Sequence, residues 1–135
     1  MKALNTAIYS RLSGATALTS LLAGTASVYA IQAENNATYP YCVYSLQSGL
    51  DENMTQNRTK DMLYFIRGYS KISNAQAGSI DAQIDAAIHH VAFTVTGWTN
   101  FWLAREESIE LVENAPTGEQ VWMNGGLYRV RIDLN

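Results

Sequence analysis

The stretch "YPYCVYSLQ", Tyr39–Gln47, predicts the beginning of a β-strand. The segments before and after it are interpreted by their position relative to this strand. Aromatic and β-branched side chains at Tyr41, Val43 and Tyr44 favour a pleated, half-buried surface. Pro40 suits the first position of a strand but not its middle, because proline has no N–H for the ladder. The stretch therefore predicts a strand that opens at Tyr41 and belongs to the scaffold of the domain.

A second alternating segment, Asp61–Tyr69, follows a polar stretch, "SGLDENMTQNRT", over Ser48–Thr59. Both faces of the second segment are largely apolar, which predicts a central strand. The polar stretch has no period and is long for a tight hairpin turn. We therefore predict a β-hairpin with a protruding arm over about residues 48–59.

Helical patterns occur on both sides of this hairpin. Residues 4–12 carry apolar side chains at helical spacing and end at Gly14, and a second short helical piece covers about residues 15–22. A short strand is predicted over residues 28–31. Downstream, Ser73 is a suitable N-cap, with Gln76 at the capping-box spacing. The helix after it has one apolar stripe: Ala77, Ile80, Ile84, Ala87, Ile88 and Val91.

The last third of the chain has the composition of β-structure. Strand pieces are predicted over residues 98–103 and 108–112, with the intervening "AREE" as a bulge or kink, then over 121–123 and 127–134. A turn is expected at 114–118, and Asn124-Gly125-Gly126 would separate the last two pieces. The order predicts a single α+β domain over residues 1–135, with a mostly antiparallel sheet and helices on one face.

Composition excludes several classes of function. Hydrophobic residues make up 47% and charged residues 16%, a balance of globular rather than disordered chains. The net charge of −3 and the scattered 9 Lys and Arg residues argue against a nucleic-acid-binding surface. The single cysteine, Cys42, excludes an internal disulfide and is expected in the core.

The N-terminus allows an alternative interpretation. Lys2, the apolar "ATALTSLLAG" and Val28–Ala30 resemble parts of a secretory signal with a cleavage site. Arg11 and the Ser13-Gly14 pair interrupt that pattern, and the first residues fit an amphipathic helix better. No apolar run approaches the roughly 20 residues of a membrane span.

No group of residues predicts catalysis, a cofactor or a metal. His89 and His90 are adjacent, so on a helix they diverge and cannot easily share one metal ion. Asp81 and Asp85, at i and i+4, are interpreted as a solvated helix face, and Glu106-Glu107 as a charged step in a strand. The acidic residues of the 48–59 stretch lack the calcium-loop spacing. We therefore predict that the protein is not an enzyme.

Large aromatic residues exceed what a small core needs, as in Trp98, Phe101, Trp102 and Trp122. Tyrosine and tryptophan are enriched in protein–protein interfaces, although a role in the core is equally compatible with any one of them.

The sequence of motifs resembles the small tail-completion or tail-terminator proteins of long-tailed phages. The resemblance covers nearly the whole chain and rests on "SVYAIQA", "YPYCVYS", "MLYFIRGYS", "IDAQIDAAIHHV", "ESIELVEN" and "LYRVRIDL". Cys42, the "DENMTQN" arm and the Trp-rich segment 98–102 depart from the usual pattern, which leaves the partner surfaces open.

The resemblance implies a structural role in a virion assembled in the host cytoplasm. Such proteins form a hexameric ring at the head-proximal end of the tail, contacting the tail tube protein and a head-completion or connector protein. DNA would only pass through the lumen, without sequence-specific binding. In this interpretation the Tyr-Pro-Tyr strand packs the helices onto the sheet and binds no ligand.

Candidate interface residues follow from these expectations. We expect Asp51 and Glu52, with Asn53, to lie near the lumen or a subunit interface, because the arm is the longest polar excursion. Arg129 and Arg131 share the polar face of the last strand and should pair with acidic groups in the sheet or on a neighbour. Among the aromatic residues, Trp98 and Trp102 are the interface candidates.

Three alternatives remain open on the sequence alone. One is another phage neck or tail-tube structural protein, such as a head-completion protein or a minor tube subunit. Another is a secreted small binding domain, if the N-terminus is a signal. A small enzyme is the third, although no convergent polar cluster supports it.

Overall fold

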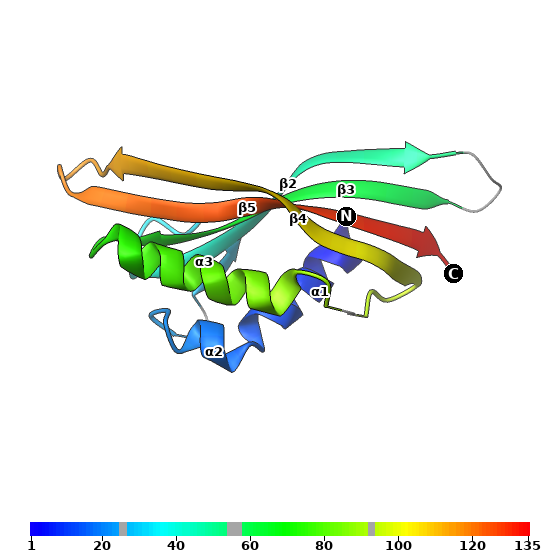
Figure 1. The fold of residues 1–135 in the computed structure, drawn as a ribbon, viewed down its shortest axis with the longest axis horizontal. Helices are drawn as coiled ribbons and strands as arrows, with labels where there is room; N and C mark the ends of the chain where they lie inside the picture. Colours follow the sequence, from blue (N-terminus) through cyan, green and yellow to red (C-terminus); the bar gives the residue numbers. More distant parts are fainter. Residues whose placement is uncertain (25–26, 54–57, 92–93) are drawn as a thin grey trace.

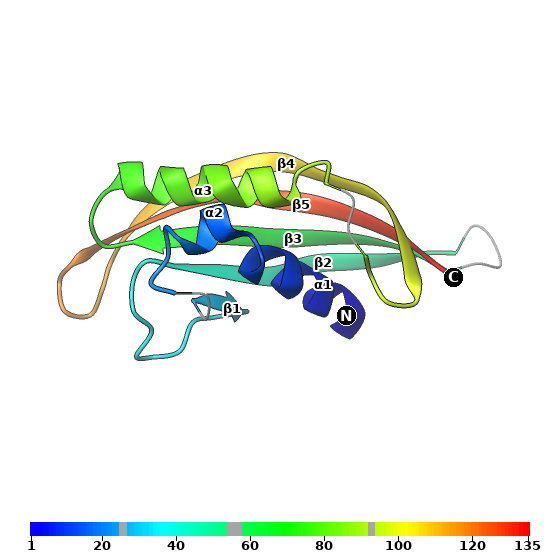
Figure 2. The same ribbon diagram turned by 90° about the horizontal axis from the view of Figure 1, so that it is seen from below.

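The computed structural model of the chain describes residues 1–24, 27–53, 58–91 and 94–135. Its elements in chain order are α1 (Lys2–Ser13), α2 (Thr16–Thr19), β1 (Val28–Ala30), β2 (Tyr41–Glu52), β3 (Thr59–Ser70), α3 (Asn74–Ile88), β4 (Trp98–Asn114) and β5 (Gln120–Leu134). The strands form a sheet in the order β1-β2-β3-β5-β4. Only the β1–β2 pair is parallel among these strands. The helices lie on one face of the sheet (Figures 1 and 2). The predicted α+β class and the central position of β3 are confirmed.

The core lies between this face and the helices. Leu4, Ile8 and Leu12 of α1 are buried, as the helical spacing predicts. They meet the sheet residues that alternate toward the helices: Cys42, Tyr44, Met62, Tyr64, Ile66, Tyr128, Val130 and Ile132. Each fully buried aliphatic or aromatic side chain contributes roughly 1.5–3 kcal/mol to folding. Cys42 is fully buried, and desolvation raises the pKa of its thiol to about 12, so its predicted role in the core is confirmed.

Helix α3 begins at the predicted N-cap and buries most of the predicted apolar stripe. The Ser73 hydroxyl accepts a hydrogen bond from the Gln76 backbone N–H at 3.1 Å. The Gln76 side chain does not complete the capping box, because it accepts a hydrogen bond from the Ser70 hydroxyl instead. The buried stripe is Ala77, Ile80, Ile84, Ala87 and Ile88, whereas Val91, expected in it, is half-buried beyond the helix end.

The two C-terminal strands are longer than predicted. The expected pieces 98–103 and 108–112 are one strand, β4, and the predicted irregularity in "AREE" is a register shift between Arg105 and Glu107 that does not end it. The predicted break at 124–126 is wrong, because β5 runs through it. A Cβ on Gly125 would lie 2.5 Å from the Arg67 Cβ, and one on Gly126 would lie 2.5 Å from the Arg105 Nε. These glycines therefore allow close packing across the sheet rather than a turn.

Much of the predicted polar arm belongs to the regular strands of the sheet and is not a loop. Glu52 pairs with Thr59, so only residues 53–58 connect the two strands, and residues 54–57 lie outside the described ranges. Strand β5 pairs with β3 beside this hairpin, and β4 pairs with β5. We call this part of the sheet the sheet extension: Ser48–Glu52, Thr59–Leu63, Arg129–Leu134 and Trp98–Ala104. In Figure 1 these strands continue to the right, past the C-terminal end of α3.

Gly68 provides a test of the packing between β3 and α3. A Cβ there would lie 2.4 Å from the Ile80 Cγ2, and Ile80 is a fully buried, branched side chain. We expect Gly68→Ala to lower the free energy of unfolding by about 1–3 kcal/mol through overpacking. Urea unfolding would measure the change.

Gly78 supplies the matched control, because nothing lies within 4 Å of an added Cβ at that position in α3. Gly78→Ala should raise the free energy of unfolding by about 0.4–1 kcal/mol, since alanine restricts the unfolded chain. Equal effects of the two substitutions would contradict the packing argument.

Candidate functional site

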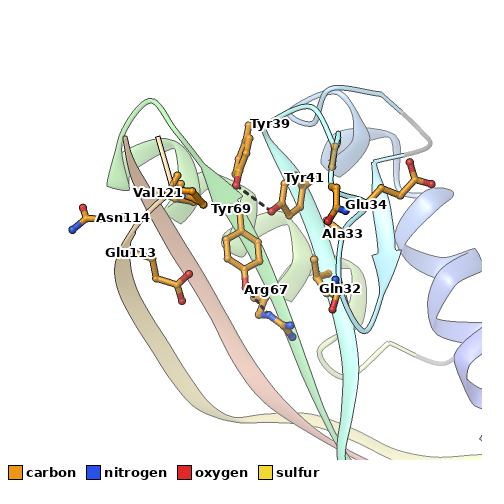
Figure 3. Close-up of a pocket in the computed structure, with 15 residues that line it drawn as sticks. Gln32, Ala33, Glu34, Tyr39, Tyr41, Arg67, Tyr69, Glu113, Asn114 and Val121 are labelled. Carbon is orange, nitrogen blue, oxygen red and sulfur yellow. Dashed lines mark hydrogen bonds between the residues drawn. The ribbon is translucent and has the colours of Figure 1, made fainter. Parts of the chain in front are cut away.

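A hollow at one end of the sheet is lined by tyrosines (Figure 3). It has a volume of about 340 Å³ and lies between the segment around Gln32–Tyr39 and the turn that joins β4 to β5. The Tyr41 ring packs against Tyr39 and Tyr69, with centroids 4.6 and 5.2 Å apart. Tyr41 points to the face opposite Cys42 and Tyr44, so the expectation that all these aromatics pack the helices is wrong for Tyr39 and Tyr41.

Arg67 and the tyrosines of this hollow are engaged in structural hydrogen bonds. Arg67 donates to the Tyr69 hydroxyl at 2.9 Å and to the Ser45 hydroxyl at 3.0 Å. It also donates to the Ile31 carbonyl at 3.3 Å. Burial raises the pKa of Tyr41, which therefore stays protonated at neutral pH. The hollow therefore joins the segment around Ile31 to the sheet through Arg67.

The polar face of the sheet extension is held by an ionic cluster. Arg129 contacts Asp61 at 2.6 Å and Glu106 at 2.9 Å, and Arg131 contacts Asp61 at 3.4 Å. Asp61 is only 7% exposed. The hydrogen bond to Asp61 contributes most to raising the pKa of Arg129, and the hydrogen bond to Glu106 raises it further. Arg129 therefore stays positively charged. The prediction that both arginines pair with acidic groups is confirmed within the sheet, where the cluster joins β3, β5 and β4.

A second ionic cluster fixes α3 to the sheet. The Arg105 guanidinium contacts Asp81 at 2.9 Å and Asp85 at 3.7 Å, and the Tyr128 hydroxyl donates to Asp85 at 3.2 Å. Arg105 also donates to the Gly125 carbonyl at 2.7 Å. The interpretation as a solvated helix face is therefore wrong for Asp81, whereas Asp85 stays partly solvated while it faces the same arginine. Their partner lies on β4, and helical spacing alone gives no sign of it.

The two histidines have structural contacts at the end of α3. The helix ends at Ile88, so His89 and His90 follow its last turn. The His89 Nδ1 accepts a hydrogen bond from the Arg105 backbone N–H at 2.9 Å. The His90 ring meets the Trp102 ring edge-on at 5.5 Å. No group of three or more potential metal ligands occurs in the described ranges.

All the candidate interface residues lie in the sheet extension or directly beside it. Asp51 and Glu52 end β2, Asn53 follows them, Arg129 and Arg131 are on β5, and Trp98 and Trp102 are on β4. Lys60 contacts Asp51 at 2.7 Å, and this hydrogen bond lowers the pKa of Asp51. The Trp102 side chain is 44% exposed, whereas Trp98 is half-buried. Their role in an interface stays a prediction.

Two residues of this region were missed in the sequence. Asp61 is the carboxylate shared by both arginines, and an acidic residue inside an alternating strand was the available signal. Leu50, 65% exposed, lies in the stretch interpreted as polar. Both become noticeable once the strands are known to extend beyond the helices.

The Arg105 cluster gives a paired prediction. The Asp81 side chain is 19% exposed and makes the closer contact, whereas Asp85 is 40% exposed. We expect Asp81→Asn to lower the free energy of unfolding by about 1.5–3 kcal/mol, because it removes a partly buried, charged hydrogen bond. Asp85→Asn should cost less than about 1 kcal/mol, as for other solvated ion pairs. Urea unfolding of both variants checks the order, and the reverse order would refute this description of the cluster.

Comparisons with known proteins agree with the fold. The sequence model of a family described as "Tail completion protein gp17" matches residues 6–133. A chain in a solved structure described as "Virion of native gene transfer agent (GTA) particle" has the same fold, with a TM-score of 0.76 and 16% sequence identity. That alignment covers 96% of this chain and 94% of the other. No curated protein matches the sequence.

Among the described residues, no helix is long and apolar enough to cross a membrane.

The family match spans nearly the whole chain, and the fold agrees with it over the same length. The chain therefore belongs to the tail completion protein gp17 family, and it is a structural component of a phage virion rather than an enzyme.

Proposed function

We propose that the protein forms a hexameric ring at the head-proximal end of a phage tail. There it ends polymerisation of the tail tube and joins the tail to the head connector. Its partners are copies of itself, the tail tube protein and a head-completion or connector protein. The observation that supports assembly best is the sheet extension, which carries large apolar side chains at its edges.

The exposed side chains of the extension are unusual for an isolated subunit. Leu50 on β2 is 65% exposed, and Phe101 and Trp102 on β4 are 50% and 44% exposed. The core on the helix face is complete without them. Exposed aromatic residues that are grouped at one site are typical of protein–protein interfaces. An interface between two different surfaces of identical chains generates a ring when the rotation closes.

The charge distribution suits a channel for DNA. The net charge is −3, and β4 carries exposed acidic side chains at Glu107, Glu110 and Glu113. Negative groups repel phosphates, so DNA would pass a lumen of this character without adhering to it. In this proposal Asp51 and Glu52 lie near the lumen or a subunit interface.

The oligomeric state is the first test. We expect closed rings of about six subunits in solution, because the interface surfaces differ and the rotation closes. Light scattering and negative-stain images of one sample would measure the mass and the shape. Stacked polymers would instead favour a tail-tube subunit. A protein that stays monomeric and also fails to stop the growth of tail tubes would refute the terminator role.

The position of the extension is the second test. A cryo-electron microscopy map of the assembled ring should place Asp51 and Glu52 at the lumen or between subunits, since the exposed apolar residues of the extension need a partner. Both residues facing free solvent on the outer wall would contradict that placement, even in a closed ring.

A further inference from the structure

The two edges of the sheet extension have complementary surfaces. Pairing across the extension places Leu50, Asp61, Arg131 and Trp102 in one row, from β2 through β3 and β5 to β4. Leu50 and Trp102 are thus at the same height on opposite edges. A rotation about an axis along the strands would bring the Leu50 edge of one copy to the Trp102 edge of the next.

No strand of the described residues pairs with the outer edge of β2 along the extension. β1 pairs with β2 only from Cys42 to Tyr44, and the last bond on this side is from the Ile31 N–H to the Tyr44 carbonyl at 2.8 Å. Ile31 has a φ of 68°, an unusual value for a β-branched residue, and this turns the chain away from β2. Beyond it, the residues from Ser45 to Leu50 include no charged side chain or proline of the kind that usually protects an exposed edge.

The edge of β4 carries an aromatic hollow at the same height. It has a volume of about 210 Å³ and is lined by His90, Val91, Asn100, Phe101, Trp102 and Leu103. The register shift between Asn100 and Trp102 makes Phe101 an extra residue on this edge. The Leu103 carbonyl accepts from the His90 N–H at 2.9 Å, and the Arg105 N–H donates to His89. The end of α3 therefore closes the ladder there, and the hollow is suited to a side chain rather than to a long added strand.

The direction of the strands agrees with the same contact. β2 and β4 run in opposite directions, because three antiparallel pairings separate them. A neighbour related by rotation along the strands would thus place its β2 antiparallel to β4.

From these observations we infer that the Leu50 edge of β2 in one copy packs into the Phe101–Trp102 hollow on β4 of the next copy. The contact is between different surfaces, so it propagates around a ring instead of stopping at a dimer. This inference rests on the proposed ring and specifies its subunit interface.

A matched pair of exposed aliphatic residues tests the contact. Leu50 is 65% exposed and Ile72, between β3 and α3 at the other end of the sheet, is 72% exposed. Leu50→Asp should raise the concentration at which half the protein is in rings by about tenfold or more, while Ile72→Asp leaves it unchanged. Light scattering measures assembly, and thermal unfolding checks that both variants fold. Equal assembly of both variants would overturn the inference.

Disulfide formation gives a second, positive readout. The double variant Leu50→Cys with Trp102→Cys should form a ladder of cross-linked species up to the ring size after mild oxidation of the rings. The buried Cys42 should not take part. The pair Ile72→Cys with Trp102→Cys should give no ladder. A cross-linked dimer from Trp102→Cys alone would instead indicate contact between two β4 edges and overturn the inference.

The outcomes separate the contact from the ring itself. Closed wild-type rings without a Leu50–Trp102 ladder would refute this interface and leave the proposed function standing. Wild-type protein that forms no rings and does not stop tube growth would refute the proposed function, and this inference with it.

Discussion

The pairing of β3 with β5 is the constraint on which the rest of the structure depends. It runs without a register shift from Thr59 opposite Asp133 to Ser70 opposite Trp122. It places Tyr64 opposite Tyr128, and both are fully buried beneath the helices. Because side chains alternate along a strand, a slip by one residue would move every one of them to the wrong face. The core, the ionic clusters and the extension all depend on this register.

The register also explains why charge gathers on the face away from the helices. With Tyr64 and Tyr128 directed to the helices, Asp61 and Arg129 must point to the other face, where they meet. The Arg105 cluster is the exception, since Arg105 lies on the helix side and needs both aspartates of α3 there. A partly buried arginine is tolerated because Asp81, the Gly125 carbonyl and the Tyr128 hydroxyl accept hydrogen bonds from its two terminal nitrogens.

The sequence predicts the parts of this fold that arise from local patterns. Alternation around Tyr64 and the stripe through Ile80 and Ile84 identify a strand and a helix with the correct buried faces. The sequence misleads where a residue serves a distant partner. Gly125 lies in an Asn-Gly-Gly stretch typical of turns, but in the structure it allows the close approach of Arg67. Asp81 lies at the helical spacing expected of a solvated helix face, but it pairs with Arg105 on strand β4. The candidate interface residues could be selected by type, yet only the paired strands bring them to one end of the sheet.

Strand β4 has two different halves, and this bears on aggregation. Trp98–Ala104 contains no charged residue, whereas the part beyond it carries Glu106, Glu107, Glu110 and Glu113. Exposed edges with like charges repel each other, which hinders the side-by-side addition of strands that leads to fibres. The acidic half of the strand would keep concentrated free subunits apart along most of that edge. In the proposed interface, attachment is confined to one short uncharged segment, which limits the open-ended addition of strands along this edge.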